Sequence, residues 1–360
     1  MIGYLWYFIR DRNIGVNIIE LKYFIYKAHL PAPIKTSKLL ITDKSGIIVR
    51  LKNNEGRYGY GEASPLPNFS RENIKEIIEI VQRIEARLKF DEYIDDTNLL
   101  RFTNNYASLN FGFEQAIYSL NTPAEYNSIL LNYIPLNFLI GLRSDNEVLA
   151  SVENAVENGY KTIKLKIGER SFTEDLSLIK KIRGKFKDIL LRVDVNGAWN
   201  IKTAINNIRM LNPLEIQYIE QPVNGLNELL SVAEKVETPL APDESISSLS
   251  DAEFAINSGL IDYIVIKPMN IGFNDSLKII ELANKNGKSV IVSSMFESPI
   301  GKNALFYLAA KTKHNYAHGL SINVKMEQNL LEQEAIISEG TIAYNGKLYP
   351  YPHSIDQLFE

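Results

Sequence analysis

Five charged residues recur at nearly regular intervals in the second half of the chain, each near the end of an apolar run. They are Lys166 in TIKLKIG, Asp194 in ILLRVDVNG, Glu220 in QYIEQPV, Asp243 in PLAPDES and Lys267 in YIVIKPM. The steps between them are 23 to 28 residues long, which is typical of one strand-and-helix unit in a parallel barrel. Because the carboxyl ends of the strands meet at one rim of such a barrel, the pattern predicts two lysines facing three carboxylates across a single mouth.

These residue types predict proton transfer assisted by a metal ion. Three neighbouring carboxylates repel one another and favour a divalent cation that neutralises them. A lysine beside such a cation has its charged form disfavoured, so it can act as a base. Strand alternation places Lys164 on the same face as Lys166, and Arg192 and Asn196 on the same face as Asp194. A single charge at a strand end is ordinarily a solvated loop residue, but five charges in register with five strands favour a shared site.

The rhythm of the sequence predicts the elements that position this site. From about residue 136, apolar runs alternate with amphipathic helical segments, and their number matches a (β/α)8 TIM-like barrel. The runs are PLNFLIGL, TIKLKIG, ILLRVDVNG, QYIEQPV, TPLAPDES, YIVIKPM, SVIVSSM and the weaker YAHGLS. A doubly wound open sheet is the competing α/β architecture. It would carry a glycine-rich phosphate turn after an early strand, which this sequence lacks.

The first third of the chain predicts a separate α+β unit. Residues 17–60 are rich in strand formers, and helical periodicity follows over 73–90 and about 109–120. Between the first two strands, the polar stretch 31–46 with Pro31 and Pro33 predicts a loop. We expect three parts: the α+β unit at 1–130, in which 1–14 are an extension, the barrel at 131–325, and a segment at 326–360 that returns to the first unit.

Composition excludes several classes of partner. The chain of 360 residues is 45% hydrophobic and 23% charged, which is ordinary for a soluble globular protein. A net charge of −4 gives no indication of a nucleic-acid partner. Without cysteine there are no disulfides or thiolate metal sites. The N-terminal apolar stretch, Ile2 to Ile9, is too short for a bilayer and lacks the features of a signal peptide. We therefore expect a cytoplasmic protein without a membrane partner.

The motif order identifies a family resemblance. Lys-x-Lys, Asp-x-Asn, Glu-Gln-Pro, Asp-Glu-Ser and Lys-Pro resemble the muconate-cycloisomerase branch of the enolase superfamily over about residues 20–325. The resemblance implies an α+β domain that caps the barrel, completed by the C-terminal tail, and a bound Mg²⁺ that Mn²⁺ can replace. Carried over residue by residue, it implies that Asp194, Glu220 and Asp243 are the metal ligands and that Lys166 and Lys267 are the acid–base pair.

The same resemblance implies roles for the neighbours of these residues. Lys164 is expected to disfavour the charged form of Lys166. Glu244, Asn196 and Arg192 are expected beside the ligands, where they support them. The loop from Pro31 to Ser37 is expected to close over the substrate.

Within the branch, three segments are similar to the o-succinylbenzoate synthase family. Gly59–Pro67, followed by Phe69 and Ser70, is similar to its GWGE-x-x-PLP-x-x-S pattern, with Tyr60 in place of Trp. Ser293–Gly301 resembles S-S-x-x-E-S-x-x-G, and the segment 318–320 resembles H-G-L. The residues after it, 321–323, depart from the usual Gly-Thr or Asp-Thr, which leaves the local loop shape open.

This likeness implies a reaction and a set of substrate contacts. The reaction is dehydration of 2-succinyl-6-hydroxy-2,4-cyclohexadiene-1-carboxylate to 2-succinylbenzoate, a step of menaquinone biosynthesis. It proceeds by lysine-mediated removal of the α-proton, stabilisation of the ene-diolate and syn elimination of water. The implied substrate contacts are Ser293, Ser294, Gly319 and Leu320.

Several alternatives stay open at this stage. A dipeptide epimerase would need an Asp-x-Asp at the eighth strand, where this chain has Gly319-Leu320-Ser321. A muconate-type cycloisomerase and an N-succinylamino acid racemase share the barrel machinery, and a catalytically silent barrel could serve as a binding scaffold. His318 has either a structural place or one at the mouth. The expected partner is a small-molecule carboxylate, and a homo-oligomer is possible.

Overall fold

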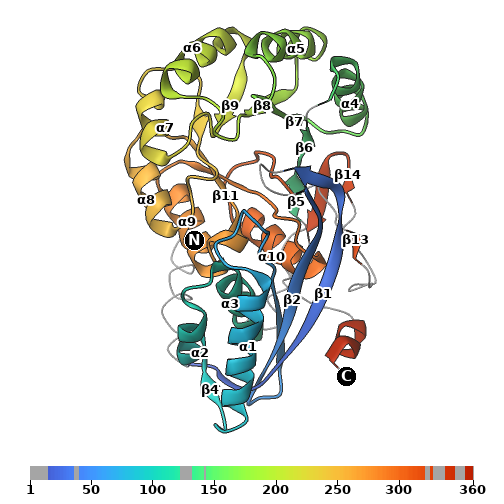
Figure 1. Ribbon diagram of the computed structural model, residues 1–360, viewed down its shortest axis with the longest axis vertical. Helices are drawn as coiled ribbons and strands as arrows, with labels where there is room; N and C mark the ends of the chain where they lie inside the picture. Colours follow the sequence, from blue (N-terminus) through green and yellow to red (C-terminus); the bar gives the residue numbers. More distant parts are fainter. Residues whose placement is uncertain are drawn as a thin grey trace, which may run out of the picture.

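The computed structural model describes residues 15–35, 40–121, 132–141, 143–320, 325–326, 337–344 and 353–359. A unit of long strands and three helices lies beside a ring of alternating strands and helices (Figure 1). This is the expected arrangement of an α+β capping unit on a (β/α)8-type barrel. None of the described helices combines the length and apolarity needed to cross a bilayer.

The capping unit is built on an antiparallel sheet with the strand order β13-β1-β2-β3, and β4 also pairs with β1. The strands are β1 (Asn17–Lys35), β2 (Leu40–Asn53), β3 (Tyr58–Ala63), β4 (Ile94–Asp95) and β13 (Lys325–Met326). Helices α1 (Ile74–Leu88), α2 (Asp96–Thr103) and α3 (Ala107–Asn121) accompany them. The two predicted helices are confirmed as α1 and α3. Helix α2 was not predicted, because eight residues are too few to show a clear helical period.

Local sequence explains where these helices form and how they pack. Helix α1 begins at Asn73, whose side chain accepts hydrogen bonds from the N–H groups of Lys75 and Glu76. Helix α3 packs on β3 where Gly61 meets Gly112, and a Cβ added at Gly61 would lie 1.8 Å from the Gly112 carbonyl oxygen. This close approach requires glycine. It places Glu62, the next residue of β3, at the boundary with the barrel.

The predicted loop at 31–46 is wrong over most of its length. Strand β1 continues to Lys35, and β2 begins at Leu40 and pairs with it. A shift of register between His29 and Ile34 accommodates Pro31 and Pro33, because bulges tolerate residues that cannot donate to the ladder. Residues 36–39 lie outside the described residues, and they include Thr36 and Ser37 of the segment expected to close over the substrate.

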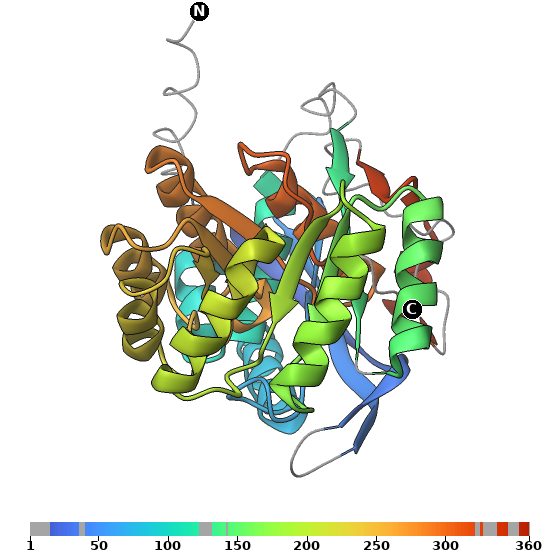
Figure 2. The same ribbon diagram turned by 90° about the horizontal axis from the view of Figure 1, so that it is seen from above.

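The barrel is formed by parallel strands separated by helices. Strands β6 to β10 form one sheet, and β11 and β12 form a parallel pair. They are β6 (Asn137–Ile140), β7 (Thr162–Lys166), β8 (Leu190–Asp194), β9 (Ile216–Glu220), β10 (Leu240–Ala241), β11 (Tyr263–Ile266) and β12 (Ser289–Val292). The helices are α4 (Asp145–Glu157), α5 (Phe172–Lys185), α6 (Ile201–Leu211), α7 (Leu226–Ala233), α8 (Leu249–Asn257), α9 (Phe273–Lys285) and α10 (Pro299–Ala310). Figure 2 shows the green and yellow helices on the outside of their strands.

A few backbone hydrogen bonds close the ring where the sheets separate. The Val265 N–H donates to the Pro242 carbonyl at 3.0 Å, which joins β11 to the end of β10. The segment at 318–319 provides the eighth position. Its Gly319 N–H donates to the Val292 carbonyl at 2.9 Å, and its His318 carbonyl accepts from the Asn137 N–H at 3.0 Å. The weakest of the predicted apolar runs, YAHGLS, is therefore a short bridge between β12 and β6.

The C-terminal tail contacts both parts of the molecule. Strand β13 pairs with β1, and the 3-10 helix η4 (His353–Phe359) contacts the same strand. The tail segments β14 (Ile337–Ser338) and β15 (Thr341–Tyr344) instead form a small sheet with β5 (Asn132–Pro135). The tail thus completes the capping sheet, as expected. The domain limits after residues 130 and 325 stay predictions.

Candidate active site

Strand register brings the five charged residues to one rim. Lys166 lies opposite Asp194 in the pairing of β7 with β8, and Asp194 lies opposite Glu220 in the pairing of β8 with β9. Asp243 follows β10 by two residues, and Lys267 follows β11 directly. The predicted convergence of two lysines and three carboxylates is therefore present in the structure.

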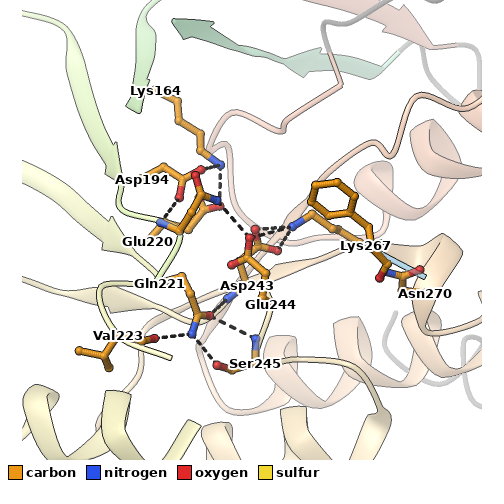
Figure 3. Close-up of polar contacts among 12 residues, drawn as sticks. Lys164, Asp194, Glu220, Gln221, Val223, Asp243, Glu244, Ser245, Lys267 and Asn270 are labelled. Atoms are coloured by element: carbon orange, nitrogen blue, oxygen red, sulfur yellow. Dashed lines mark hydrogen bonds and ion pairs between the residues drawn. The ribbon is translucent and has the colours of Figure 1, made fainter. Parts of the chain in front are cut away.

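The carboxylates are already paired with lysines, which the sequence reasoning did not foresee. The Lys164 Nζ lies 3.0 Å from Asp194 Oδ2 and 2.5 Å from Glu220 Oε1. The Lys267 Nζ donates to both carboxylate oxygens of Asp243. Figure 3 shows the two ammonium groups approaching the acids from opposite sides. The acids are thus partly neutralised by side chains of their own site.

The chemistry of the three carboxylates still fits a divalent cation. Asp194, Glu220 and Asp243 are buried, and together they offer the hard oxygen ligands that Mg²⁺ prefers. The Glu220 Oε2 is buried and has no hydrogen-bond partner among the described residues. Within the described part of the chain, no group of three acids or histidines is preassembled at metal-binding spacing. The lysine nitrogens lie among the carboxylate oxygens, so metal binding would have to displace them.

Burial and neighbouring charges shift the pKa values of the residues in this cluster. Burial by itself lowers the pKa of Lys164, but Asp194 and Glu220 outweigh it and raise that pKa well above its ordinary value. For Lys267, burial likewise acts downward, and Asp243 and its neighbours raise the pKa overall. Burial, reinforced by Asp194 and Asp243, raises the pKa of Glu220 well above its usual range. Both lysines are therefore favoured as cations, whereas the charged form of Glu220 is disfavoured.

Lys166 is held differently from its two neighbours. Its side chain lines the same pocket as Lys164 and Lys267. Unlike them, it makes no hydrogen bond or ion pair with any residue that the structure describes. An amine without a carboxylate partner is available to take a proton from a ligand in the pocket.

Two residues fix the acids, and one of them, Gln221, lies outside the predicted set. The Gln221 Oε1 accepts from the Asp243 N–H at 2.8 Å and from the Ser245 N–H at 3.2 Å, which shapes the segment after β10 (Figure 3). Asn196, one of the predicted supporting residues, donates from Nδ2 to Glu244 Oε1 at 3.1 Å. Its own N–H donates to Asp194 Oδ1 at 3.1 Å. Sequence reasoning quoted Gln221 only as part of a motif and gave it no role.

A pocket of about 150 Å³ opens above the rim. Its walls contain most of the predicted site residues. Those that line it are Lys164, Lys166, Asp194, Asn196, Asp243, Glu244, Lys267, Ser293, Ser294 and Gly319. Five apolar residues to which the sequence reasoning gave no role also line it: Leu66, Phe69, Leu139, Met295 and Phe296. Leu66 and Phe69 belong to the capping unit, and the signal for them was the motif that begins at Gly59, which was used only as a family resemblance.

Four residues weighed for the site do not line the pocket: Glu220, which pairs with Lys164, and Arg192, Leu320 and His318. Leu320 is buried in the main hydrophobic core and does not line the pocket, so its expected substrate contact is wrong. Arg192 is fully buried in the barrel, with its guanidinium over the ring of Tyr218 and its Nη1 donating to the Ala317 carbonyl at 2.7 Å. His318 accepts the Val292 N–H at Nδ1, which favours its structural reading.

The fold and this rim define the class of protein. Residues 147–347, more than half of the chain, match the family described as enolase C-terminal domain-like, and the chain belongs to that family. Residues 20–120 match a second family, described as the MenC N-terminal domain. The match of the capping unit confirms the resemblance to o-succinylbenzoate synthases that the motifs predict.

The relatives of this chain include proteins with different activities. The o-succinylbenzoate synthase of Thermosynechococcus vestitus is 28% identical over 305 residues, which cover 83% of this chain and 91% of that protein. The L-Ala-D/L-Glu epimerase of Bacillus subtilis is 25% identical over 351 residues, which cover 92% and 95%. A solved dipeptide epimerase of Enterococcus faecalis, complexed with Mg and L-Leu-L-Tyr, matches with a TM-score of 0.77 and 23% identity over 91% of this chain and 97% of that one. Similarity to relatives therefore does not decide between the synthase and epimerase reactions, and the residues of the site have to be considered.

Proposed function

We propose that this chain is a magnesium-dependent dehydratase that forms 2-succinylbenzoate from 2-succinyl-6-hydroxy-2,4-cyclohexadiene-1-carboxylate. The observation that carries the proposal is the unequal state of the pocket lysines. Lys166 has no partner among the described residues, whereas Lys267 is ion-paired with Asp243. One pocket thus presents an available amine and a fixed cation. The match of residues 20–120 to the MenC N-terminal domain supports this reaction within the superfamily.

Each lysine has one task in the proposed reaction. Neutral Lys166 removes the proton α to the substrate carboxylate, and the resulting ammonium returns a proton to the departing hydroxyl on the same face. One C–H and one C–O bond break, water leaves, and the ring becomes aromatic. Lys267 stays positively charged and stabilises the negative charge that develops on the substrate. Mg²⁺ held by Asp194, Glu220 and Asp243 would supply further positive charge next to the substrate carboxylate.

The described part of the pocket suits a substrate without an ammonium group. A dipeptide's ammonium, buried without a carboxylate partner, would lose several kcal/mol of binding. The acids in the pocket wall all have partners there: Lys164 contacts Asp194, Lys267 contacts Asp243, and Asn196 contacts Glu244. The described eighth-strand position provides Gly319 instead of an acid. A neutral or anionic tail, such as a succinyl group, fits a wall of serines and backbone better.

An ultraviolet assay for the aromatic product tests the proposal. The cyclohexadiene substrate should be dehydrated rapidly, whereas L-Ala-L-Glu should be epimerised negligibly. N-succinylamino acids serve as a third arm, since proton exchange at Lys166 and Lys267 can also racemise them. Faster exchange of a dipeptide's α-proton with solvent deuterium than dehydration of the cyclohexadiene would overturn the substrate assignment. Loss of all proton transfer on every substrate would favour a binding scaffold instead.

A further inference from the structure

A second buried charge network lies where the capping sheet meets the barrel, and the proposed reaction does not use it. It consists of Lys44 on β2, Glu62 on β3 and Glu297 just before α10, each no more than 1% exposed. Burial lowers the pKa of Lys44, and Glu297 and Glu62 oppose that change. Charged groups in such a position are strongly destabilising unless each has a specific partner. Their partners therefore indicate what the network holds in place.

Two of these residues fix both backbone polar groups of Met295. The Lys44 Nζ donates to the Met295 carbonyl oxygen at 2.6 Å. The Met295 N–H donates to the two carboxylate oxygens of Glu297 at 2.8 and 3.0 Å. The Ser294 hydroxyl also donates to Glu297, at 2.5 Å, and accepts from the Phe296 N–H at 3.0 Å. The turn Ser294–Glu297 is thus held from the barrel side by Glu297 and from the capping side by Lys44.

This turn has a strained backbone at the pocket wall. Phe296 has a φ of +66°, in the left-handed region that bulky side chains seldom adopt. Such a conformation persists only where the surroundings over-determine it. Ser294, Met295 and Phe296 all line the pocket. The strain thus occurs in a segment that forms part of the pocket wall.

Glu62 anchors the chain immediately after the turn. Its carboxylate accepts from the N–H groups of Ser298 and Gly301, each at 2.9 Å, at the beginning of α10. It also accepts from the hydroxyls of Tyr26 and Ser64, each at 2.5 Å. The start of α10 is therefore fixed independently of Lys44. Removal of the Lys44 ammonium should consequently loosen the turn and leave the helix in place.

We infer that Lys44, a residue of the capping sheet, is a positioning residue for the pocket turn Ser294–Glu297 and thereby for the tail of the bound substrate. The kinetic part of this inference rests on the proposed function, whereas its structural part does not. According to this inference, the capping unit affects how the substrate fits in two ways. Leu66 and Phe69 form part of the pocket wall, and Lys44 positions the turn through the Met295 carbonyl.

The test is Lys44→Met, which keeps the length of the side chain and removes the donor. Amide hydrogen exchange at residues 294–297 should be faster by roughly tenfold, because a hydrogen bond to a charged group is lost. KM for the cyclohexadiene substrate should rise by a similar factor, with kcat changed much less, as expected when binding rather than chemistry is affected. A purely structural role would lower the amount of active enzyme and leave KM unchanged. Lys52→Met, the same change farther along β2, is the control and should alter neither quantity.

A double variant keeps the inference testable if Lys44→Met fails to fold. Lys44→Met leaves Glu62 and Glu297 buried without an ammonium, and Lys44→Met combined with Glu297→Gln removes one of these charges while retaining an acceptor for the Met295 N–H. Relative to Glu297→Gln alone, the double variant should still show faster exchange and a raised KM. Exchange in a folded double variant that equals that of Glu297→Gln alone would overturn the inference. If the wild-type enzyme does not dehydrate the cyclohexadiene, the proposed function fails alone, since the exchange measurement needs no substrate.

Discussion

The three lysines of the pocket differ in their partners, and in the proposed reaction this difference separates their roles. Lys164 is enclosed by Asp194 and Glu220, and Lys267 is bound to Asp243, so both are fixed as cations. Lys166 stands one alternation beyond Lys164 on β7 and has no partner among the described residues. The same residue type can thus provide permanent positive charge at two positions and a proton acceptor at a third.

The first prediction for a single residue concerns Lys166. Lys166→Ala should lower kcat by at least about a hundredfold, because it removes the group that transfers the proton. Its melting temperature should stay close to that of the wild type, since no described hydrogen bond or ion pair is lost. Lys161→Ala, at the exposed approach to the same strand, is the matched control and should retain full activity. Near-normal kcat in Lys166→Ala would place the base elsewhere.

A second prediction concerns the carboxylates. Mg²⁺ should raise the melting temperature of the wild type, since a ligand at about a hundred times its Kd stabilises a protein by about 2.7 kcal/mol. Glu220→Gln keeps the size of the side chain and removes its charge, so the shift should largely disappear. Asp275→Asn, an exposed acid on α9 paired with Lys278, is the control. Chelation should also abolish turnover, and Mg²⁺ or Mn²⁺ should restore it. An undiminished shift in Glu220→Gln would contradict the ligand assignment.

Residue spacing predicts which side chains reach the rim, but not how they pair. The strand period of two places Asp194 and Lys166 toward the mouth, and the structure agrees. The contact of Lys164 with Glu220 depends on side-chain length and rotamer, which spacing does not specify. The place of Leu320 could not be predicted from spacing either, because adjacent residues can share the pocket wall, as Ser293 and Ser294 do, or separate, as Gly319 and the buried Leu320 do.

At the scale of elements, long periodic segments were predictable and short or irregular ones were not. Helices α1 and α3 each run for 15 residues and match their predicted positions. The extension of β1 to Lys35 was hidden by Pro31 and Pro33, because prolines ordinarily indicate a loop and the bulge that accommodates them leaves no sequence signal. The small sheet of β5, β14 and β15 was likewise missed, since its strands have only two to four residues.

Acids of the capping unit also complete the ends of barrel helices. Helix α9 begins after Gly272, which has no side chain to cap it. Glu114 of α3 supplies the missing acceptor, and its Oε2 accepts from the Asn274 N–H at 2.9 Å. Burial, with a contribution from Asp275, raises the pKa of Glu114 to about 7, although the Asn274 N–H favours the charged form. Glu62 has the corresponding place at α10.

This contact predicts a pH dependence of stability. An unfolded glutamate releases its proton near pH 4.5 and folded Glu114 near pH 7, so the folded protein binds more protons between these values. Rising pH over this range therefore lowers the contribution of Glu114 to the free energy of unfolding, by up to about 3 kcal/mol. Glu114→Gln removes this term and keeps an acceptor for Asn274. In urea unfolding, its stability relative to the wild type should increase from pH 4.5 to 7 and stay constant above.

The control for this prediction is Glu79→Gln, an exposed position on α1. Its difference from the wild type should show no comparable trend across the same pH range. A pH-independent difference for Glu114→Gln would mean that Glu114 is ionised normally in the folded protein.

At the scale of the whole molecule, contacts between distant parts of the chain join the capping sheet to the tail. In η4, Asp356 accepts from Arg50 Nη1 at 3.1 Å and from the Tyr60 hydroxyl. The guanidinium of Arg50 also lies 4.8 Å from the ring centre of Phe359. Such contacts join residues about 300 positions apart, so local sequence patterns do not reveal them. The family resemblance indicated that the tail completes the capping domain, but only the structure identifies Asp356 as its anchor.

The last prediction follows from this anchor. Asp356→Ala leaves Glu20, 3.2 Å away, as the remaining described carboxylate beside the buried Arg50 guanidinium, and it removes one acceptor of the Tyr60 hydroxyl. The free energy of unfolding should fall by about 1–3 kcal/mol, since buried donors lose a charged partner. The exposed pair of Asp275 and Lys278 provides the comparison: Asp275→Ala should change stability by no more than about 0.5 kcal/mol. Because Asp356 lies outside the pocket wall, kcat per folded molecule should be unchanged in both variants. Equal effects of the two substitutions in urea unfolding would show that the tail does not stabilise the capping sheet through Asp356.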